Sequence, residues 1–163
     1  MDLTTLLLVA LLALAIVGLI WLNKRPANQA STDFQTLPLR LQAYERLVLL
    51  TERISLPHLI SRLNNPALSA DEMKTVLIEN IKQEFDYNST QQLYVSATAW
   101  EAVRNLKEQN IHLINQVSVS LGWQATGPML NKKILDILLT QPEKPLDDVV
   151  RSILNEEAKR LMR

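Results

Sequence analysis

An apolar segment at residues 3–22, LTTLLLVALLALAIVGLIWL, sets the organisation of the chain. It has no charged residue, no proline and one glycine, Gly18. A helix rises about 1.5 Å per residue, so a segment of this length reaches about 30 Å, the thickness of the hydrocarbon core of a bilayer. Inside lipid every backbone N–H and C=O needs an internal partner, which a helix provides. We therefore predict a single-pass transmembrane anchor over residues 1–25.

Two other interpretations of this segment are weaker. A cleaved signal peptide would need a basic stretch before a shorter apolar core and a small-residue cleavage site after it. Here the nearest basic residues, Lys24 and Arg25, follow the apolar run. A buried core helix would be shorter and less uniformly apolar. A permanent membrane tether is therefore the favoured interpretation.

The residues after the segment predict its orientation. Lys24 and Arg25 follow it directly, and basic residues beside a span favour the cytoplasmic side. Trp21 lies at the same boundary, where its ring suits the lipid headgroup layer. We therefore assign Trp21, Lys24 and Arg25 as candidate membrane-interface residues. The lipid bilayer is the first expected partner, with the N-terminus outside and residues 26–163 in the cytoplasm.

The rest of the chain reads as a polar linker, residues 26–37, followed by one soluble domain, residues 38–163. Without Asp2, Lys24 and Arg25, the remaining 15 basic and 16 acidic residues nearly cancel. Nucleic-acid binding needs a basic face, so we expect no nucleic-acid partner. The chain has no cysteine, which excludes disulfides, thiol nucleophiles and thiolate metal sites.

The domain is expected to be all-α, a compact bundle of five or six helices after the N-terminal transmembrane helix. Two glycines lie beyond the anchor, which is few for a strand-rich domain. Pro38 suits the first turn of a helix, Ser69 and Glu72 have capping-box spacing, and Gly122 suits the residue after a helix end. The predicted helices span residues 38–54, 55–63, 69–88, 90–121, 129–141 and 146–162.

Two segments resemble a known family. They are LPLRLQAYERLVLLTERI at residues 37–54 and QQLYVSATAWEAVRNLKEQNIHLIN at residues 91–115. Both are similar to an uncharacterised family of short, single-span, membrane-anchored helical proteins from Bacteroidota. The resemblance implies a bacterial inner-membrane setting. It brings no activity, substrate or catalytic residue with it.

The residues that could carry chemistry have simpler structural explanations. Glu108 and His112 are four apart on the long predicted helix, a spacing that a metal site could use. An exposed helix face with pairs such as Arg104–Glu108 explains the same pattern. His58 follows Pro57 at a helix start without a nearby Ser, Asp or Cys partner. No phosphate loop, nucleophile elbow or zinc helix motif is present, so we predict no catalytic, cofactor-binding or metal site.

Four aromatic residues lie at apolar positions of the predicted helices: Tyr44, Phe85, Tyr94 and Trp100. Packing in the core is the favoured interpretation. The alternative is a partner surface, because arginine and aromatic residues are enriched where interfaces hold most of their energy. The candidate partner surface consists of Arg40, Tyr44, Arg46 and Trp100.

The leading functional hypothesis is a membrane-tethered helical interaction module, a non-catalytic subunit or assembly factor of an inner-membrane complex. Its partner would be a membrane protein or a second copy of the chain, because a tether raises the effective concentration near such partners. The alternative is a sensor or enzyme domain with a small-ligand pocket in the bundle. A cavity near His58 or His112 would favour the alternative, whereas a filled core with an exposed apolar patch would favour the module.

Overall fold

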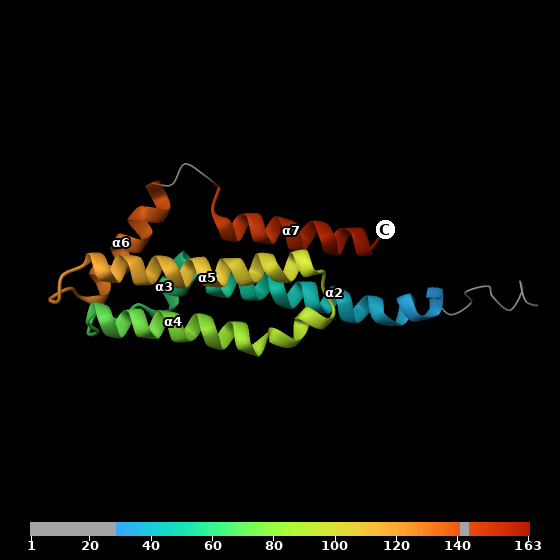
Figure 1. The fold of residues 1–163 in the computed structure, drawn as a ribbon, viewed down its shortest axis with the longest axis horizontal. Helices are drawn as coiled ribbons and strands as arrows, with labels where there is room; N and C mark the ends of the chain where they lie inside the picture. Colours follow the sequence, from blue (N-terminus) through green and yellow to red (C-terminus); the bar gives the residue numbers. More distant parts are fainter. Residues whose placement is uncertain (1–28, 141–143) are drawn as a thin grey trace, which may run out of the picture. The chain divides into compact units, whose positions relative to one another are not determined.

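The computed structural model describes residues 29–140 and 144–163, and these residues form helices (Figure 1). Leu37–Arg163 is one compact unit, and residues 29–36 belong to the preceding one. The all-α prediction is therefore confirmed for the described part, with six α-helices and one 3-10 helix. In chain order they are α2 (Gln29–Ile54), α3 (Leu56–Leu63), α4 (Ala70–Tyr87), η1 (Ser89–Leu93), α5 (Ala97–Ser120), α6 (Gly127–Thr140) and α7 (Leu146–Leu161).

The predicted transmembrane segment lies outside the described residues. Among the helices within 29–140 and 144–163, none is long and apolar enough to cross a bilayer. The anchor, its orientation and the interface residues Trp21, Lys24 and Arg25 therefore stay predictions.

Helix α2 begins earlier than the sequence predicts. The predicted linker includes residues 29–37, but these residues belong to α2, and Pro38 lies inside the helix instead of opening it. Proline in a helix interior removes one hydrogen bond and crowds the preceding turn. The stretch before it has no glycine and no second proline, so it holds no further helix breaker. The predicted start of this helix at residue 38 is therefore wrong, whereas the role of residues 26–37 as a linker stays a prediction.

The break between α2 and α3 leaves carbonyl groups that need partners. Pro57 has no N–H to donate to the carbonyl of Arg53. The Arg62 guanidinium donates to that oxygen over 3.4 Å, and the Asn110 Nδ2 of α5 donates to the carbonyl of Ile54 over 2.8 Å. Asn110 is 8% exposed, so its amide is buried against the break. It therefore fixes α5 to the end of α2 while satisfying a backbone acceptor.

The start of α4 carries the predicted capping box. The Ser69 hydroxyl accepts the Glu72 N–H at 3.3 Å, and the Glu72 carboxylate accepts the Ser69 N–H at 2.9 Å. Gly127 at the start of α6 lies against the same turn, donating its N–H to the Leu68 carbonyl at 2.8 Å. A Cβ at Gly127 would lie 3.1 Å from that oxygen and 3.2 Å from the Met73 Cβ. The close approach of α4 and α6 thus favours glycine there.

Helix α5 begins later than predicted. The sequence predicts a helix from residue 90, but η1 comes first and α5 starts at Ala97. The Ser96 hydroxyl accepts the Ala99 N–H at 3.0 Å, which makes Ser96 the N-cap. The helix ends at Ser120 with Leu121 as its C-cap, so Gly122 is the residue after the helix end, as the sequence predicts. No glycine in the described ranges has a positive φ, so Gly122 does not act as a left-handed cap.

The interior of Leu37–Arg163 is packed with apolar side chains from every helix. Helix α5 packs against α4, α6 and α7, and α3 packs against α4 and α6. One fully buried residue from each of the six α-helices illustrates the core: Leu47, Leu59, Leu77, Leu106, Ile134 and Leu154. Such burial supplies most of the driving force for folding.

We expect Asn110→Ala to lower the free energy of unfolding by about 1–3 kcal/mol, because the buried Ile54 carbonyl would lose its partner. Chemical denaturation of the full chain in detergent, followed by circular dichroism, measures the change. Asn105→Ala on the exposed side of α5 is the matched control and should be nearly neutral. Equal stability of the two variants would refute the role given to Asn110.

Candidate functional site

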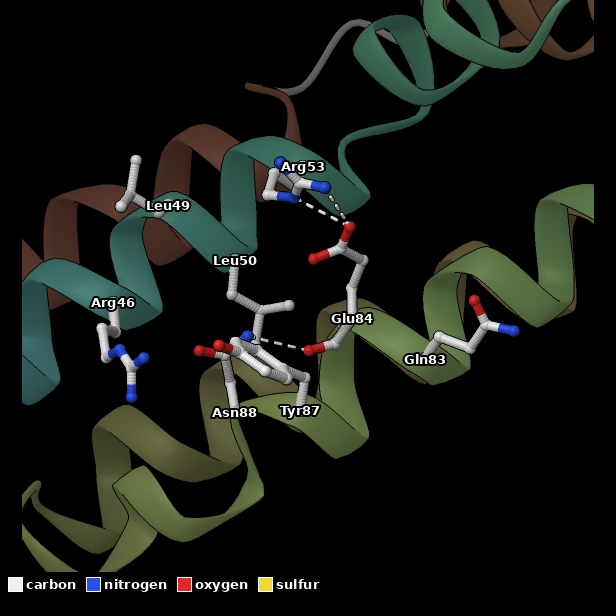
Figure 2. Close-up of a pocket in the computed structure, with 8 residues that line it drawn as sticks. All are labelled: Arg46, Leu49, Leu50, Arg53, Gln83, Glu84, Tyr87 and Asn88. Carbon is white, nitrogen blue, oxygen red and sulfur yellow. Dashed lines mark hydrogen bonds and ion pairs between the residues drawn. The ribbon is translucent and has the colours of Figure 1, made fainter.

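A groove of about 550 Å³ lies between α2 and α4 (Figure 2). The residues from α2 follow the spacing i, i+3, i+4, i+7, and those at the end of α4 repeat a similar pattern, so each helix presents one face. The lining residues are Arg46, Leu49, Leu50, Arg53, Gln83, Glu84, Tyr87 and Asn88.

One end of the groove is closed by an ion pair. The Arg53 Nε donates to the Glu84 Oε1 at 2.8 Å, and its Nη2 donates to the same oxygen. These hydrogen bonds raise the pKa of the Arg53 guanidinium. Arg62 adds a second cation 3.9 Å from the Glu84 carboxylate and donates to the Asn80 Oδ1 at 2.7 Å. At this end two arginines therefore share one carboxylate of the same chain.

At the other end of the groove, Arg46 lies beside an aromatic ring and, in the described part of the chain, has no carboxylate partner. The Arg46 guanidinium lies 5.8 Å from the centre of the Tyr87 ring, a cation–π distance. Among the described residues no carboxylate lies within ion-pair distance of Arg46. Tyr87 is 74% exposed, and Leu49 is 53% exposed. This end therefore offers a cation beside accessible apolar surface.

The four residues of the predicted partner surface do not share an exposed face. Arg46 lines the groove, whereas Arg40 is half-buried on α2 and does not. Tyr44 is 2% exposed, so its place on an exposed surface is wrong. Trp100 is half-buried, with its ring centre 5.0 Å from that of Phe85. The favoured interpretation, packing in the core, describes Tyr44, Phe85 and Trp100.

Of the lining residues, the sequence singled out only Arg46 for a partner surface, and it missed the exposed apolar pair Leu49 and Tyr87. Leu49 lies inside the apolar run at residues 47–50, which reads as one stripe. The buried residues are Leu47, Leu50 and Ile54, spaced three and four apart, and Leu49 is out of phase with them. The helical phase of Leu49 relative to the buried residues of α2 is the signal that could have identified it as exposed.

The Tyr44 hydroxyl belongs to a polar cluster that ties α7 to the bundle. It donates to the Glu157 Oε2 at 2.7 Å, and the Ser96 hydroxyl donates to the same oxygen at 2.5 Å. The Ser96 N–H donates to the Tyr44 oxygen at 3.2 Å. Burial, together with the hydrogen bond to Glu157, raises the pKa of Tyr44. Because the serine and tyrosine hydroxyls both donate to this carboxylate, the cluster is suited to holding helices together.

The other end of α7 is fastened by a second polar contact. The Ser55 hydroxyl, between α2 and α3, donates to the Asp147 Oδ2 at 2.7 Å. Ser55 occupies the N-cap position of α3, and its side chain makes no capping hydrogen bond to that helix. Val150 and Leu154 are buried between the two contacts. One face of α7 thus carries a carboxylate at each end and apolar residues between them.

Both histidines are exposed and neither lines the groove. The His58 Nδ1 lies 3.9 Å from the Glu52 carboxylate. His112 is on the exposed side of α5, where Arg104 pairs with Glu101 and not with the carboxylate four positions after it. Within the described ranges no cluster of three or more His, Asp or Glu side chains is arranged to hold a metal ion. The structure therefore gives the groove, and not the histidines, as the candidate site.

A family model with the description "Family of unknown function (DUF7935)" matches residues 2–161. No curated protein and no solved structure matches the chain. The family match agrees with the resemblance to an uncharacterised family. It names neither a taxon nor a membrane anchor, so those parts of the resemblance stay predictions.

We expect Tyr44→Phe to lower the free energy of unfolding by about 1 kcal/mol near neutral pH, through loss of its hydrogen bond to Glu157. The pKa of folded Tyr44 is raised above the ordinary value of 10.0, so the unfolded tyrosine loses its proton first as pH rises. Stability from this group is therefore present below pH 10 and is lost as pH rises through the raised pKa.

Urea denaturation at several alkaline pH values measures this effect. The stability of the wild-type protein should fall more steeply above pH 10 than that of Tyr44→Phe. Tyr94→Phe, at a residue that is 40% exposed, should follow the wild-type curve. Parallel curves for the wild type and Tyr44→Phe would contradict the assignment.

Proposed function

We propose that this chain, which belongs to the family of unknown function DUF7935, is a membrane-tethered helical interaction module. It would act as a non-catalytic subunit or assembly factor of a bacterial inner-membrane complex, with residues 3–22 in the bilayer. The groove between α2 and α4 would be the surface that contacts a membrane-protein partner.

The observation that carries this proposal is accessible apolar surface beside an arginine, over a filled core. Leu49 and Tyr87 are both more than half exposed, although each is large and largely apolar. Exposed apolar surface of this kind costs solubility unless a partner covers it. Tyrosine and arginine are also enriched among the residues that dominate interface energies.

The small-ligand alternative has less support. A small-molecule site encloses most of its ligand in a concave pocket with a few convergent polar groups. The groove is instead formed across the faces of two helices, and the side chains of Leu49, Arg53 and Tyr87 are each more than half exposed. Neither His58 nor His112, near which a cavity would have favoured this alternative, lines it.

The tether is supported by the sequence of residues 3–22 and by the extent of the family match. The match begins at residue 2, so the apolar segment lies inside the region that the family model covers. A permanent tether would hold the groove near membrane partners and raise their effective concentration.

The tether predicts that the wild-type protein stays with membranes after washing at high salt and high pH, and is released by detergent. Leu12→Arg combined with Ile16→Arg should shift the protein to the soluble fraction, because each central arginine costs about 2.5–3.5 kcal/mol on insertion scales. Immunoblotting of the two fractions measures the shift.

Leu139→Arg, at a residue that is 84% exposed on α6, is the control and should remain in the membrane fraction. A reporter that is active only after export, fused at Arg163, should stay inactive. Release of the wild-type protein by alkaline washing, or an active reporter, would count against the tether or its orientation.

The interaction role predicts a partner after affinity purification from gently solubilised membranes. Leu49→Ala combined with Tyr87→Ala should reduce recovery of that partner strongly, because truncating central interface residues costs more than about 1–2 kcal/mol each. Val119→Ala combined with Leu139→Ala removes side chains outside the groove that are 87% and 84% exposed. This control variant should still recover the partner.

Mass spectrometry of the eluted material, compared between the two double variants, measures the loss. Recovery of the wild-type chain alone as a monomer would contradict an interaction module. Equal loss of the partner in both variants would place the contact elsewhere.

A further inference from the structure

We propose that the groove recognises a carboxylate on its partner: Arg46 pairs with an Asp or Glu side chain of a membrane-protein segment whose neighbouring apolar residues pack on Leu49 and Tyr87. This inference rests on the proposed function and specifies the chemistry of its partner.

The two arginines that line the groove, Arg46 and Arg53, differ in their ion-pair partners. Arg53 is hydrogen-bonded twice to Glu84, and the Glu84 side chain is only 16% exposed. Arg46 faces the same groove from the same helix, yet within the described ranges it has no ion pair. Figure 2 shows the dashed contacts of Arg53 and none at Arg46. Arg46 is therefore the lining arginine that has no carboxylate partner in the described part of the chain.

The side chain of Arg46 is oriented by its contact with the Tyr87 ring. A guanidinium near an aromatic ring is attracted to the ring but keeps its full charge and its planar set of N–H donors. The 5.8 Å contact with Tyr87 thus orients Arg46 without neutralising it. A carboxylate is the group that this donor set binds best in a two-point arrangement. Leu49 and Tyr87 would exclude water from the pair and strengthen it.

The partner carboxylate is expected at the Arg46 end of the groove. At the Arg53 end, Glu84 already occupies the Nε and Nη2 donors of Arg53, so these donors are not open to a second carboxylate. Arg46 and Arg53 are seven residues apart on α2, which is about 10 Å along the helix. A partner carboxylate would therefore bind beside Arg46, with its apolar neighbours packing on the exposed Leu49 and Tyr87.

A protein segment suits this end better than a phosphate or a lipid headgroup. Phosphate and anionic lipid sites gather several cations with free donors. In this groove Arg53 is already hydrogen-bonded to Glu84, which leaves Arg46 beside apolar side chains. The chain beyond the anchor has 15 basic and 16 acidic residues, so no broad positive field supports a phosphate ligand. Apolar side chains with one carboxylate match the apolar surface and the single charge together.

The test uses the full chain in lipid nanodiscs and a synthetic peptide array with leucine and phenylalanine flanking one variable position. Peptides with Glu at that position should bind roughly tenfold or more tightly than their Gln counterparts, as expected for a hydrogen bond to a charged group. Arg46→Gln should remove this preference and leave the Gln peptides unaffected. Arg46→Lys should restore part of it, which excludes a folding defect as the cause.

Arg40→Gln is the matched control on the same helix and should keep the preference for Glu. Equal binding of Glu and Gln peptides to the wild-type chain would overturn the inference, and so would a preference that survives in Arg46→Gln. Full competition by free acetate or inorganic phosphate at the peptide concentration would point to a small-anion site and also overturn it. Self-association that disappears in Arg46→Gln would overturn it in favour of a second copy.

These outcomes separate the inference from the proposed function. If the groove double variant loses the membrane partner but the array shows no carboxylate preference, the inference fails alone. If the membrane partner is retained by the groove double variant, the proposed use of the groove fails as well.

Discussion

The bundle depends on pairing the polar groups that are buried where its helices begin and end. Pro57 interrupts the helical hydrogen bonding after α2, and the buried amide of Asn110 accounts for the carbonyl of Ile54. Tyr44 reaches Glu157 from the middle of α2, so the same helix is also held against α7. Unpaired polar groups at these places would cost more than most single apolar contacts supply.

These contacts matter for function because they fix the helix that presents the arginines of the groove. Asn110 and Tyr44 hold the inner face of α2, while Arg46 and Arg53 project from another face towards α4 (Figure 2). The two ends of the groove then differ in the partners of their arginines and in the accessible apolar surface beside Arg46. A rigid surface with one paired and one unpaired arginine is suited to orienting a partner, since electrostatic complementarity sets register and specificity more than raw affinity.

Local signals in the sequence predicted local structure well. The all-α class follows from apolar spacing and few glycines, and Ser69 with Glu72 forms the expected capping box. The features that the sequence did not predict depend on contacts between residues far apart in the chain, or on the helical phase of neighbouring apolar residues. Tyr44 and Glu157 are 113 positions apart, so no local pattern links them, and Tyr44 was therefore considered for an exposed surface. Tyr44 belongs to the core, and Trp100 packs against Phe85. Arg46, chosen by residue type alone, lines the groove, and its role in partner binding stays a prediction.

The central claim is that the groove contacts a protein at the membrane, and photo-crosslinking in intact cells tests it most directly. A photoreactive amino acid would replace Leu49 in the full chain, with the more exposed Leu139 on α6 as the reference position. The account predicts one dominant crosslinked membrane protein from position 49 and none of that product from position 139. Crosslinks that are absent at position 49, or identical at both positions, would contradict it.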